Sequence, residues 1–187
     1  MKDENLIWEE ISTEHIIQDE WIDFRRSAFR FPDGKIWQPY YSYTRRDYAV
    51  VVASDEAGQF VCVRQFRQGI RQVTTEFPAG GIEKKDGEDS EAAALRAAQR
   101  ELLEETGYVS DSWRHLLTVP ANATISDNYA YLFAAENCRK VTGQQLDAME
   151  LIHILTHSAQ EIDDLIAQGN FQQSDHVLAW LLVKQSR

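Results

Sequence analysis

Residues 100–108, RELLEETGY, place Glu101, Glu104 and Glu105 within five positions and directly before a glycine. A helix advances about 100° per residue, so these side chains share one face near its C-terminal end. That end is already negative because of the helix macrodipole, and like charges three or four residues apart repel. Mg²⁺ typically takes one or two carboxylates together with substrate phosphates and water. The spacing therefore indicates either a magnesium site or an acidic face that is exposed to solvent.

Two neighbouring features favour the metal site. No lysine follows any of these glutamates by four residues, where it would relieve the repulsion. Upstream, residues 78–81 read PAGG, and such a loop can offer free carbonyls to a metal and allow a ligand to approach the backbone closely. The preceding turns of the same helical stripe carry only Ala94, Ala97 and Ala98. We therefore expect the carboxylates to face a space that is walled by methyl groups.

Residues 80–108, GGIEKKDGEDSEAAALRAAQRELLEETGY, resemble the Nudix box, G-x5-E-x7-R-E-U-x-E-E-x-G-U, where U is a bulky apolar residue. The second half, RELLEETGY, matches at every specified position. In the first half, six residues instead of five separate Gly81 from Glu88, and eleven instead of seven separate Glu88 from Arg100. Four extra residues make about one helical turn and leave the glutamate face intact. Glu88 and Glu91 are both candidates for the first glutamate of the box.

The segments VRQFRQG and TTEFPAGG, together with an aromatic N-terminal extension, are similar to the ADP-ribose and nucleoside diphosphate sugar pyrophosphatase branch of the family. This resemblance implies hydrolysis of the pyrophosphate bond of such a small-molecule substrate, with Mg²⁺, or alternatively Mn²⁺, as the cofactor. The products would be a nucleoside monophosphate and a sugar phosphate. Two alternatives are a hydrolase of nucleoside triphosphates or dinucleoside polyphosphates, and a non-catalytic Nudix-fold nucleotide sensor. The extension and PAGG argue against the first alternative, and the intact glutamates argue against the second.

The resemblance also implies roles for individual residues of the box. Glu101 and Glu105 would bind Mg²⁺, and Glu104 would lie beside them as a ligand or support. The carbonyl of Ala79, in PAGG, would complete the coordination. Arg100 would orient the carboxylates through a salt bridge.

Outside the box, Arg67 matches a position that contacts substrate phosphates in this branch, and Glu76 is a candidate for contact with substrate or metal. Glu150 stands just before the last predicted strand, where the branch has a general base, and Asp147 is its rival. If neither is the base, Glu104 or Glu105 in the box would take that role. Several aromatic residues could stack a nucleobase, although most are expected in the core or at a subunit interface: Trp21, Trp37, Tyr40, Tyr41 and Tyr43.

The predicted elements that position these residues alternate between strands and a few helices. PDG at 32–34 predicts a turn between two strands, and YAVVVAS and FVCVRQF predict a hairpin that TTEF follows. PAGG is expected to break regular structure. A helix is predicted from about Ser90 to Thr106, with Gly107 as the residue that ends it.

Later strands are predicted at WRHLLTVP, NYAYLFAA and ELIHIL, and amphipathic helices at residues 158–168 and 174–185. This order favours a mixed-sheet α/β sandwich over a regular doubly wound fold. With the resemblance, it predicts a Nudix α/β/α sandwich at residues 46–187 and an antiparallel β extension at residues 1–45. The branch is typically homodimeric through such an extension, so a homodimer is expected.

The composition bounds the partners of the chain. Its 19 Lys and Arg against 30 Asp and Glu give a formal net charge of -11, which excludes the general attraction to phosphate backbones that nucleic-acid binders need. No signal pattern or membrane-length apolar run occurs, and Cys62 and Cys138 lack metal spacing, so we expect a cytoplasmic protein with buried, reduced thiols and no membrane partner. Four histidines show no ligand spacing and are assigned no role: His115, His153, His157 and His176.

Overall fold

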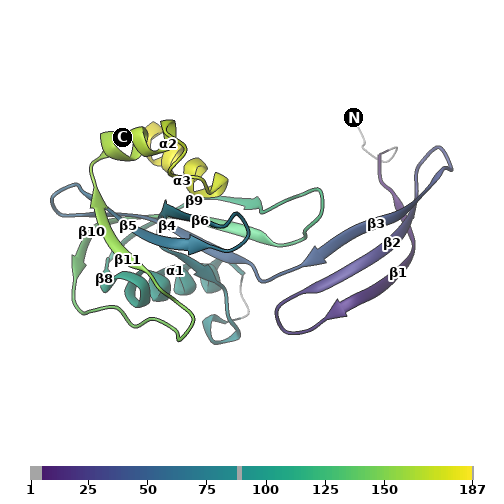
Figure 1. The fold of residues 1–187 in the computed structure, drawn as a ribbon, viewed down its shortest axis with the longest axis horizontal. Coiled ribbons are helices and arrows are strands. Elements are labelled where there is room, and N and C mark those ends of the chain that lie inside the picture. Colours follow the sequence, from purple (N-terminus) through teal and green to yellow (C-terminus); the bar gives the residue numbers. More distant parts are fainter. Residues whose placement is uncertain (1–5, 88–89, 187) are drawn as a thin grey trace. The chain divides into compact units, whose positions relative to one another are not determined.

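The computed structural model describes residues 6–87 and 90–186 (Figure 1). The chain divides into two compact units. The first consists of Met1–Arg46 and Pro120–Tyr129, and the second of Asp47–Val119 and Ala130–Arg187. The segment Pro120–Tyr129 thus joins the first unit although it is distant in the sequence. None of the helices in the described part of the chain combines the length and the apolar character that crossing a membrane requires.

The first unit is a three-stranded antiparallel sheet of β1 (Glu9–Gln18), β2 (Asp23–Arg30) and β3 (Ile36–Thr44), with β2 in the middle. Residues 120–129 bind to this sheet through backbone and side chains. The N–H of Tyr43 donates to the carbonyl of Ile125 at 2.8 Å. The Asp127 carboxylate accepts from the Arg25 guanidinium at 2.9 Å and from the Thr44 hydroxyl at 2.6 Å.

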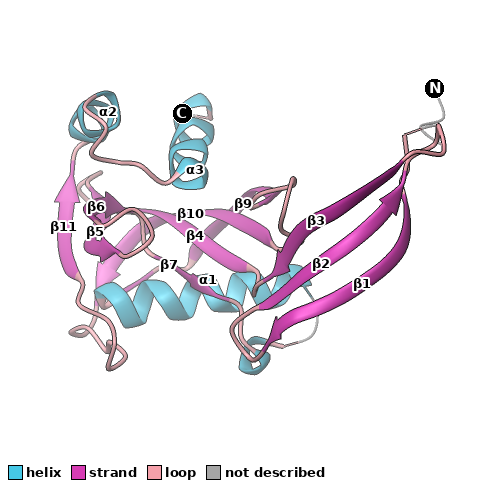
Figure 2. Ribbon diagram, turned by 45° about the vertical axis from the view of Figure 1, so that its right-hand side comes forward, coloured by secondary structure: helices cyan, strands magenta, loops and turns pink. Residues whose placement is uncertain are grey.

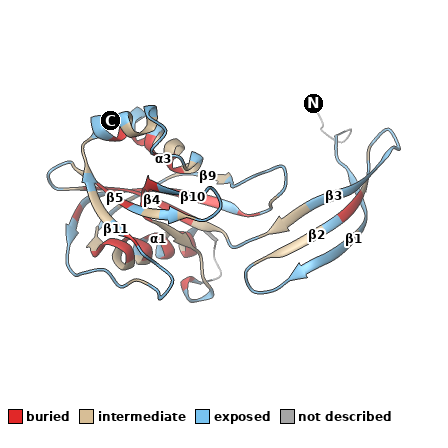
Figure 3. Cartoon of the chain, viewed as in Figure 1, coloured by how far each residue is buried: buried red, intermediate tan, exposed pale blue. Residues whose placement is uncertain are grey.

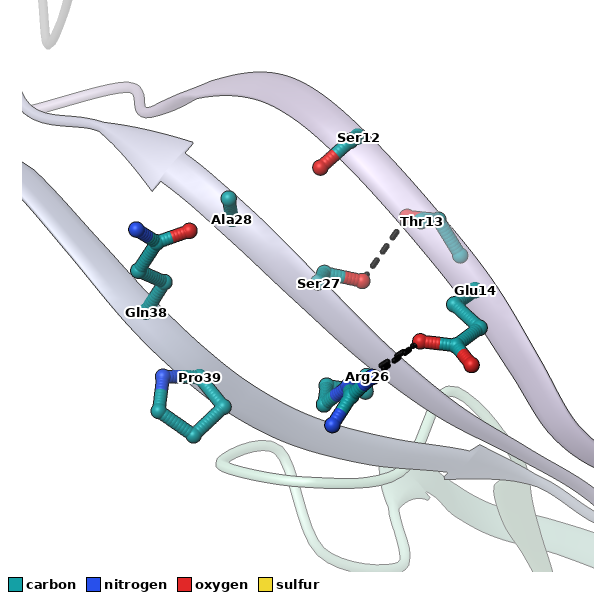
Figure 4. Close-up of a pocket in the computed structure, with 8 residues that line it drawn as sticks. All are labelled: Ser12, Thr13, Glu14, Arg26, Ser27, Ala28, Gln38 and Pro39. Carbon is teal, nitrogen blue, oxygen red and sulfur yellow. Dashed lines mark hydrogen bonds and ion pairs between the residues drawn. The ribbon is translucent and has the colours of Figure 1, made fainter.

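This sheet exposes many large apolar side chains, because three strands without a covering helix cannot bury both faces. The exposed ones in the strands are Ile11, Ile16, Ile17, Ile36, Trp37 and Tyr41, and those beside the strands are Leu6, Ile7, Trp8 and Trp21. A hollow on the sheet is lined by Ser12, Thr13, Glu14, Arg26, Ser27, Ala28, Gln38 and Pro39 (Figure 4). Arg26 is paired there with Glu14, and Thr13 is hydrogen-bonded to Ser27, so these groups already have partners.

The second unit is built on a mixed sheet in the order β11-β5-β4-β10-β8, with β6 beside β5, β7 beside β4 and β9 beside β10. Strands β4 and β10 are parallel, whereas β5 is antiparallel to β4, β6 and β11. The strands are β4 (Tyr48–Asp55), β5 (Phe60–Arg67), β6 (Gln72–Glu76), β7 (Ala79–Gly81), β8 (Tyr108–Val109), β9 (Ser112–Pro120), β10 (Tyr129–Lys140) and β11 (His153–His157).

Helices cover both faces of this sheet (Figure 2). Helix α1 (Ser90–Thr106) packs on one face, whereas α2 (Ala159–Ala167) and α3 (Ser174–Gln185) pack on the other. Alternate residues of β4 serve the two cores: Val51 packs with Leu102 of α1, and Val50 packs with Trp180 of α3. Burial is therefore concentrated in the central strands and the helix faces turned toward them (Figure 3). Burial on both faces explains the unbroken apolar run of β4, and the α/β/α sandwich predicted from the sequence is confirmed.

The expectation that PAGG breaks regular structure is wrong, because residues 79–81 form β7, which pairs with β4. The expected open space beside the carboxylates is also wrong. Ala94, Ala97 and Ala98 are fully buried, so the small side chains allow α1 to approach the sheet closely instead of lining a void.

Two further expectations concern the last strand and the cysteines. The last strand begins at His153, three residues after Glu150, so Glu150 lies within a loop. Cys62 and Cys138 are both buried and unpaired, as expected. Burial raises the pKa of the Cys138 thiol to about 11.

Candidate active site

The C-terminal end of α1 presents the three predicted carboxylates in different environments. Glu101 and Glu105 are only 8% and 3% exposed, whereas Glu104 is partly exposed. The helix ends at Thr106, and Gly107 has a φ of 75°, which a glycine adopts without strain. A Cβ on Gly107 would also overlap the carbonyl of Thr142, so the chain turns away from the helix at a position that only glycine fits.

Arg100 connects the carboxylates to the segment before the helix. Its Nη1 donates to Glu101 Oε1 at 2.6 Å and to Glu104 Oε2 at 2.9 Å. Its Nη2 donates to the carbonyl of Gly81 at 2.9 Å and to Asp86 Oδ2 at 3.1 Å, and its Nε donates to Asp86 Oδ1 at 3.2 Å. One guanidinium therefore binds two carboxylates of the helix, the end of β7 and the Asp86 carboxylate.

Asp86 is a site residue that the sequence analysis missed. It is buried in the 3-10 turn η2 (Lys84–Asp86), where its carboxylate also accepts from the Glu83 N–H at 2.8 Å. Burial alone would raise its pKa, but the hydrogen bond from Arg100 and the nearby positive charges leave the pKa below its usual value. Glu88, one candidate for this place, lies outside the described residues, and Glu91 lies exposed in the first turn of α1. The sequence feature that could have indicated Asp86 is the aspartate of KKDG. It stands five residues after Gly81, one position short of the box spacing.

Strand β7 lies directly against the acidic end of α1. The N–H of Ala79 donates to Glu105 Oε2 at 3.1 Å. A Cβ on Gly80 would overlap the carboxylate of Glu101. Glycine at position 80 thus leaves room for the Glu101 carboxylate, which any side chain there would displace. The coordination of a metal by the carbonyl of Ala79 stays a prediction.

Without a cation, burial makes negative charge on this helix end unfavourable. Burial raises the pKa of Glu101 to about 7, although Arg100 opposes the shift, and the charges of Glu104 and Glu150 add to it. The pKa of Glu105 is raised well above its ordinary value, first by burial and then by the charges of Glu101 and Glu150. The charge of Glu150 thus contributes to the raised pKa of both buried carboxylates.

The donor set fits a hard divalent cation, because it consists of carboxylate oxygens whose charge is costly to bury alone. Within residues 6–87 and 90–186, no three acidic, histidine or cysteine side chains are grouped so that they could hold an ion by themselves. Glu101 and Glu104 point to Arg100, and Glu105 points to the Ala79 N–H. Substrate phosphates and water would have to supply the remaining ligands, as is typical of Mg²⁺.

Arg67 and Glu76 bind each other on adjacent strands. Arg67 Nε lies 2.9 Å and 3.1 Å from the two carboxylate oxygens of Glu76, which is fully buried and also accepts from the Thr74 hydroxyl. Burial would raise the pKa of Glu76, but the bond and charge of Arg67 lower it overall. The Arg67 charge also acts on Glu105. Glu76 therefore holds the Arg67 guanidinium in place.

His176, to which the sequence assigned no role, is buried and holds the segment between β6 and β7. Its Nδ1 accepts a hydrogen bond from the N–H of Phe77 at 3.1 Å, and burial lowers its pKa. The neutral ring thereby fixes the backbone between Glu76 and Ala79.

Glu150 and Asp147 lie in the exposed loop between β10 and β11, where they form one turn. The N–H of Asp147 donates to Glu150 Oε2 at 3.0 Å, and the N–H of Glu150 donates to the carbonyl of Asp147 at 3.0 Å. Trp21 belongs to the first unit, not to the unit that carries the helix. It is 65% exposed, and the Arg46 guanidinium lies 5.4 Å from its ring centre.

Known proteins resemble this chain in sequence and in fold. Residues 44–181 match the family model of the NUDIX domain. The chain is 28% identical over 157 residues to the ADP-ribose pyrophosphatase of Bacillus subtilis (strain 168), covering 83% of this chain and 81% of that protein. It is 37% identical over 107 residues to the ADP-sugar pyrophosphatase of Mus musculus, covering 52% of this chain and 46% of that protein.

A solved structure described as "Crystal structure of ADP compounds hydrolase" superposes with a TM-score of 0.81, covering 95% of this chain and 92% of that one. Its sequence identity to this chain is 18%, so the likeness supports the fold.

The Gly80→Ala variant tests the close contact between β7 and α1. The added methyl group would displace the Glu101 carboxylate, which is the flexible end of a side chain, so the fold should persist with little change in Tm. Because Glu101 is a predicted metal ligand, its displacement should weaken Mn²⁺ binding, measured by calorimetry, by about tenfold or more.

Gly69→Ala is the matched control, because a Cβ at Gly69 meets no atom within 4 Å. It should bind Mn²⁺ as the wild type does. Wild-type affinity in Gly80→Ala would show that the contact does not position the carboxylate.

Proposed function

The chain belongs to the NUDIX domain family and is a Nudix pyrophosphohydrolase, and from this premise we propose that it hydrolyses ADP-ribose or another nucleoside diphosphate sugar with Mg²⁺. The products would be a nucleoside monophosphate and a sugar phosphate. The observation that carries the proposal is the buried pair Glu101 and Glu105, held by Arg100 and β7. The names of the Bacillus and Mus relatives support this substrate class over nucleoside triphosphates.

The proposed metal site consists of Glu101, Glu105 and the carbonyl of Ala79, with Glu104 as a further ligand or support. Arg100 is held in turn by Asp86, so it can keep Glu101 and Glu104 in place while the substrate enters and leaves. A bound divalent cation neutralises phosphate charge and makes water a better nucleophile at neutral pH. The chain itself carries a net charge of -11, so it offers the anionic substrate no general electrostatic attraction. The cation would therefore have to neutralise the charge of the phosphates.

The remaining proposed roles concern the substrate and the proton. Arg67, which Glu76 orients, binds a phosphate of the substrate, and a guanidinium suits this task because it donates two parallel hydrogen bonds. Glu150 accepts the proton of the attacking water, supported by the action of its charge on both buried carboxylates. Trp21 exposes a large aromatic face on which a nucleobase could stack, as could Trp37.

A hydrolysis assay with product identification tests the function. With ADP-ribose and a panel of nucleoside diphosphate sugars, the protein should release a nucleoside monophosphate and a sugar phosphate. Activity should disappear with EDTA and return with Mg²⁺ or Mn²⁺, because the carboxylates alone cannot neutralise the phosphates. Full turnover by metal-stripped protein, or release of pyrophosphate from nucleoside triphosphates as the main activity, would contradict the proposal.

Two matched variants in the same assay assign the base. Glu150→Gln keeps the shape of the side chain and removes its basicity, so kcat should fall by roughly 10²–10⁴-fold while KM stays within a few-fold. Asp147→Asn is the control and should have a smaller effect, because it is the charge of Glu150 that contributes to the raised pKa of both buried carboxylates. A reversed order would move the assignment to Asp147, and an unchanged kcat in both would move it to the box.

We further propose that the protein is a cytoplasmic homodimer in which a second copy covers the exposed apolar side chains of the first unit. Sedimentation at micromolar concentration should give the mass of two chains. Trp37→Glu, on the exposed sheet, should shift the protein toward monomer, whereas Leu181→Glu, at an exposed position of α3, should not. An active wild-type monomer at this concentration would refute the dimer.

A further inference from the structure

The loop between β10 and β11, residues 141–152, binds the C-terminal end of α1. The last carbonyls of a helix lack partners within the helix and must find them elsewhere. Here the carbonyl of Glu104 accepts from the Gln145 N–H at 2.8 Å, and that of Glu105 accepts from Gln144 Nε2 at 2.8 Å. Beyond the helix, the carbonyl of Gly107 accepts from the Val141 N–H at 2.9 Å. The loop therefore satisfies the peptide groups of two glutamates in the proposed metal site.

Gln144 differs from the other residues in these contacts because its side chain makes two of them. The same Nε2 that donates to the Glu105 carbonyl also donates to the carbonyl of Ile152 at 3.1 Å. Ile152 is buried directly before β11, two residues after Glu150. One amide group thus joins the helix that carries the buried carboxylates to the end of the loop that carries Glu150.

The loop has few other means of holding Glu150 in place. Nearly all of its residues from Val141 to Leu151 are exposed, and Met149 and Leu151, on either side of Glu150, are among the most exposed side chains of the chain. The turn with Asp147 fixes the local shape around Glu150 but not its distance from α1. That distance depends on where the loop is attached, and the Gln144 side chain joins the C-terminal end of α1 to the end of the loop at Ile152.

We propose that Gln144 is a positioning residue for the reaction, which holds Glu150 at the acidic end of α1 by bridging the carbonyls of Glu105 and Ile152. This inference rests on the proposed function, because it gives Glu150 its task as proton acceptor. Gln144 acts through Glu150 and touches neither the substrate nor the reacting atoms.

Gln144→Ala and Gln145→Ala form a matched pair that tests the inference. Gln144→Ala removes the bridge, so kcat should fall about tenfold or more through misplacement of Glu150, while KM stays within a few-fold. Gln145→Ala keeps the backbone N–H that binds the Glu104 carbonyl and should retain wild-type kcat. Both substituted residues are exposed, and the Tm of both variants should stay close to that of the wild type.

A double-mutant cycle with Glu150→Gln separates positioning from a general structural effect. If Gln144 acts through Glu150, Gln144→Ala should lower kcat less than about twofold in the Glu150→Gln background, because the effects of coupled residues are not additive. Fully additive losses, or an unchanged kcat in Gln144→Ala, would overturn the proposal.

Hydrogen exchange of the metal-free protein gives a readout that is independent of activity. Amides of residues 145–151 should exchange faster in Gln144→Ala than in the wild type or in Gln145→Ala, because the bridge limits local opening of the loop. Unchanged exchange would overturn the proposal.

The two levels of failure are distinguishable. If the wild type hydrolyses nucleoside diphosphate sugars but Glu150→Gln is fully active, only the role of Glu150 and its positioning by Gln144 are wrong. If the wild type hydrolyses none of them, the proposed function itself is wrong, and the inference falls with it.

Discussion

The burial of two carboxylates at the end of α1 is the constraint around which the second unit is arranged. A buried negative charge is costly unless other groups pair with it. Arg100 provides a positive partner for Glu101, and Asp86 and the Gly81 carbonyl hold that arginine in place. The Glu105 carboxylate accepts a hydrogen bond from the Ala79 N–H, but burial still leaves its pKa well above the ordinary value. The proposed divalent cation would supply the positive partner that Glu105 lacks.

The sandwich makes such burial possible. Both faces of the central strands are apolar, so α1 must pack on one face while α2 and α3 cover the other. The alanines of α1 bring the helix close to the sheet, and Gly80 leaves room for a carboxylate between helix and strand. Small residues in the helix and in the strand therefore allow the acidic end of α1 to lie close to β7.

Much of this arrangement could be predicted from local patterns. Three local patterns are sufficient to predict their own structure. The apolar runs predict β4, β5 and β10, the alanine-rich segment predicts α1, and the RELLEETGY spacing predicts the acidic helix face. Features that depend on distant partners could not be predicted in this way. Strand β7 exists because β4 pairs with it, Asp86 occupies a place one position away from the expected spacing, and Gln144 makes contacts that depend on the loop conformation. The pairing of Arg67 with Glu76 joins two strands whose register places Glu76 opposite Val63 and Arg67 opposite Gln72, so cross-strand register alone would not have predicted it.

The most direct test of the buried-charge constraint is thermal unfolding of the wild type and Glu105→Gln at pH 8, with EDTA and with Mg²⁺. The pKa of Glu105 is raised in the fold, so its ionisation costs stability as the pH rises, whereas an amide avoids this cost and still accepts from the Ala79 N–H. The account predicts that metal-free Glu105→Gln is at least as stable as the metal-free wild type, and that Mg²⁺ raises the Tm of the wild type more. A less stable metal-free variant, or equal stabilisation of both proteins by Mg²⁺, would contradict it.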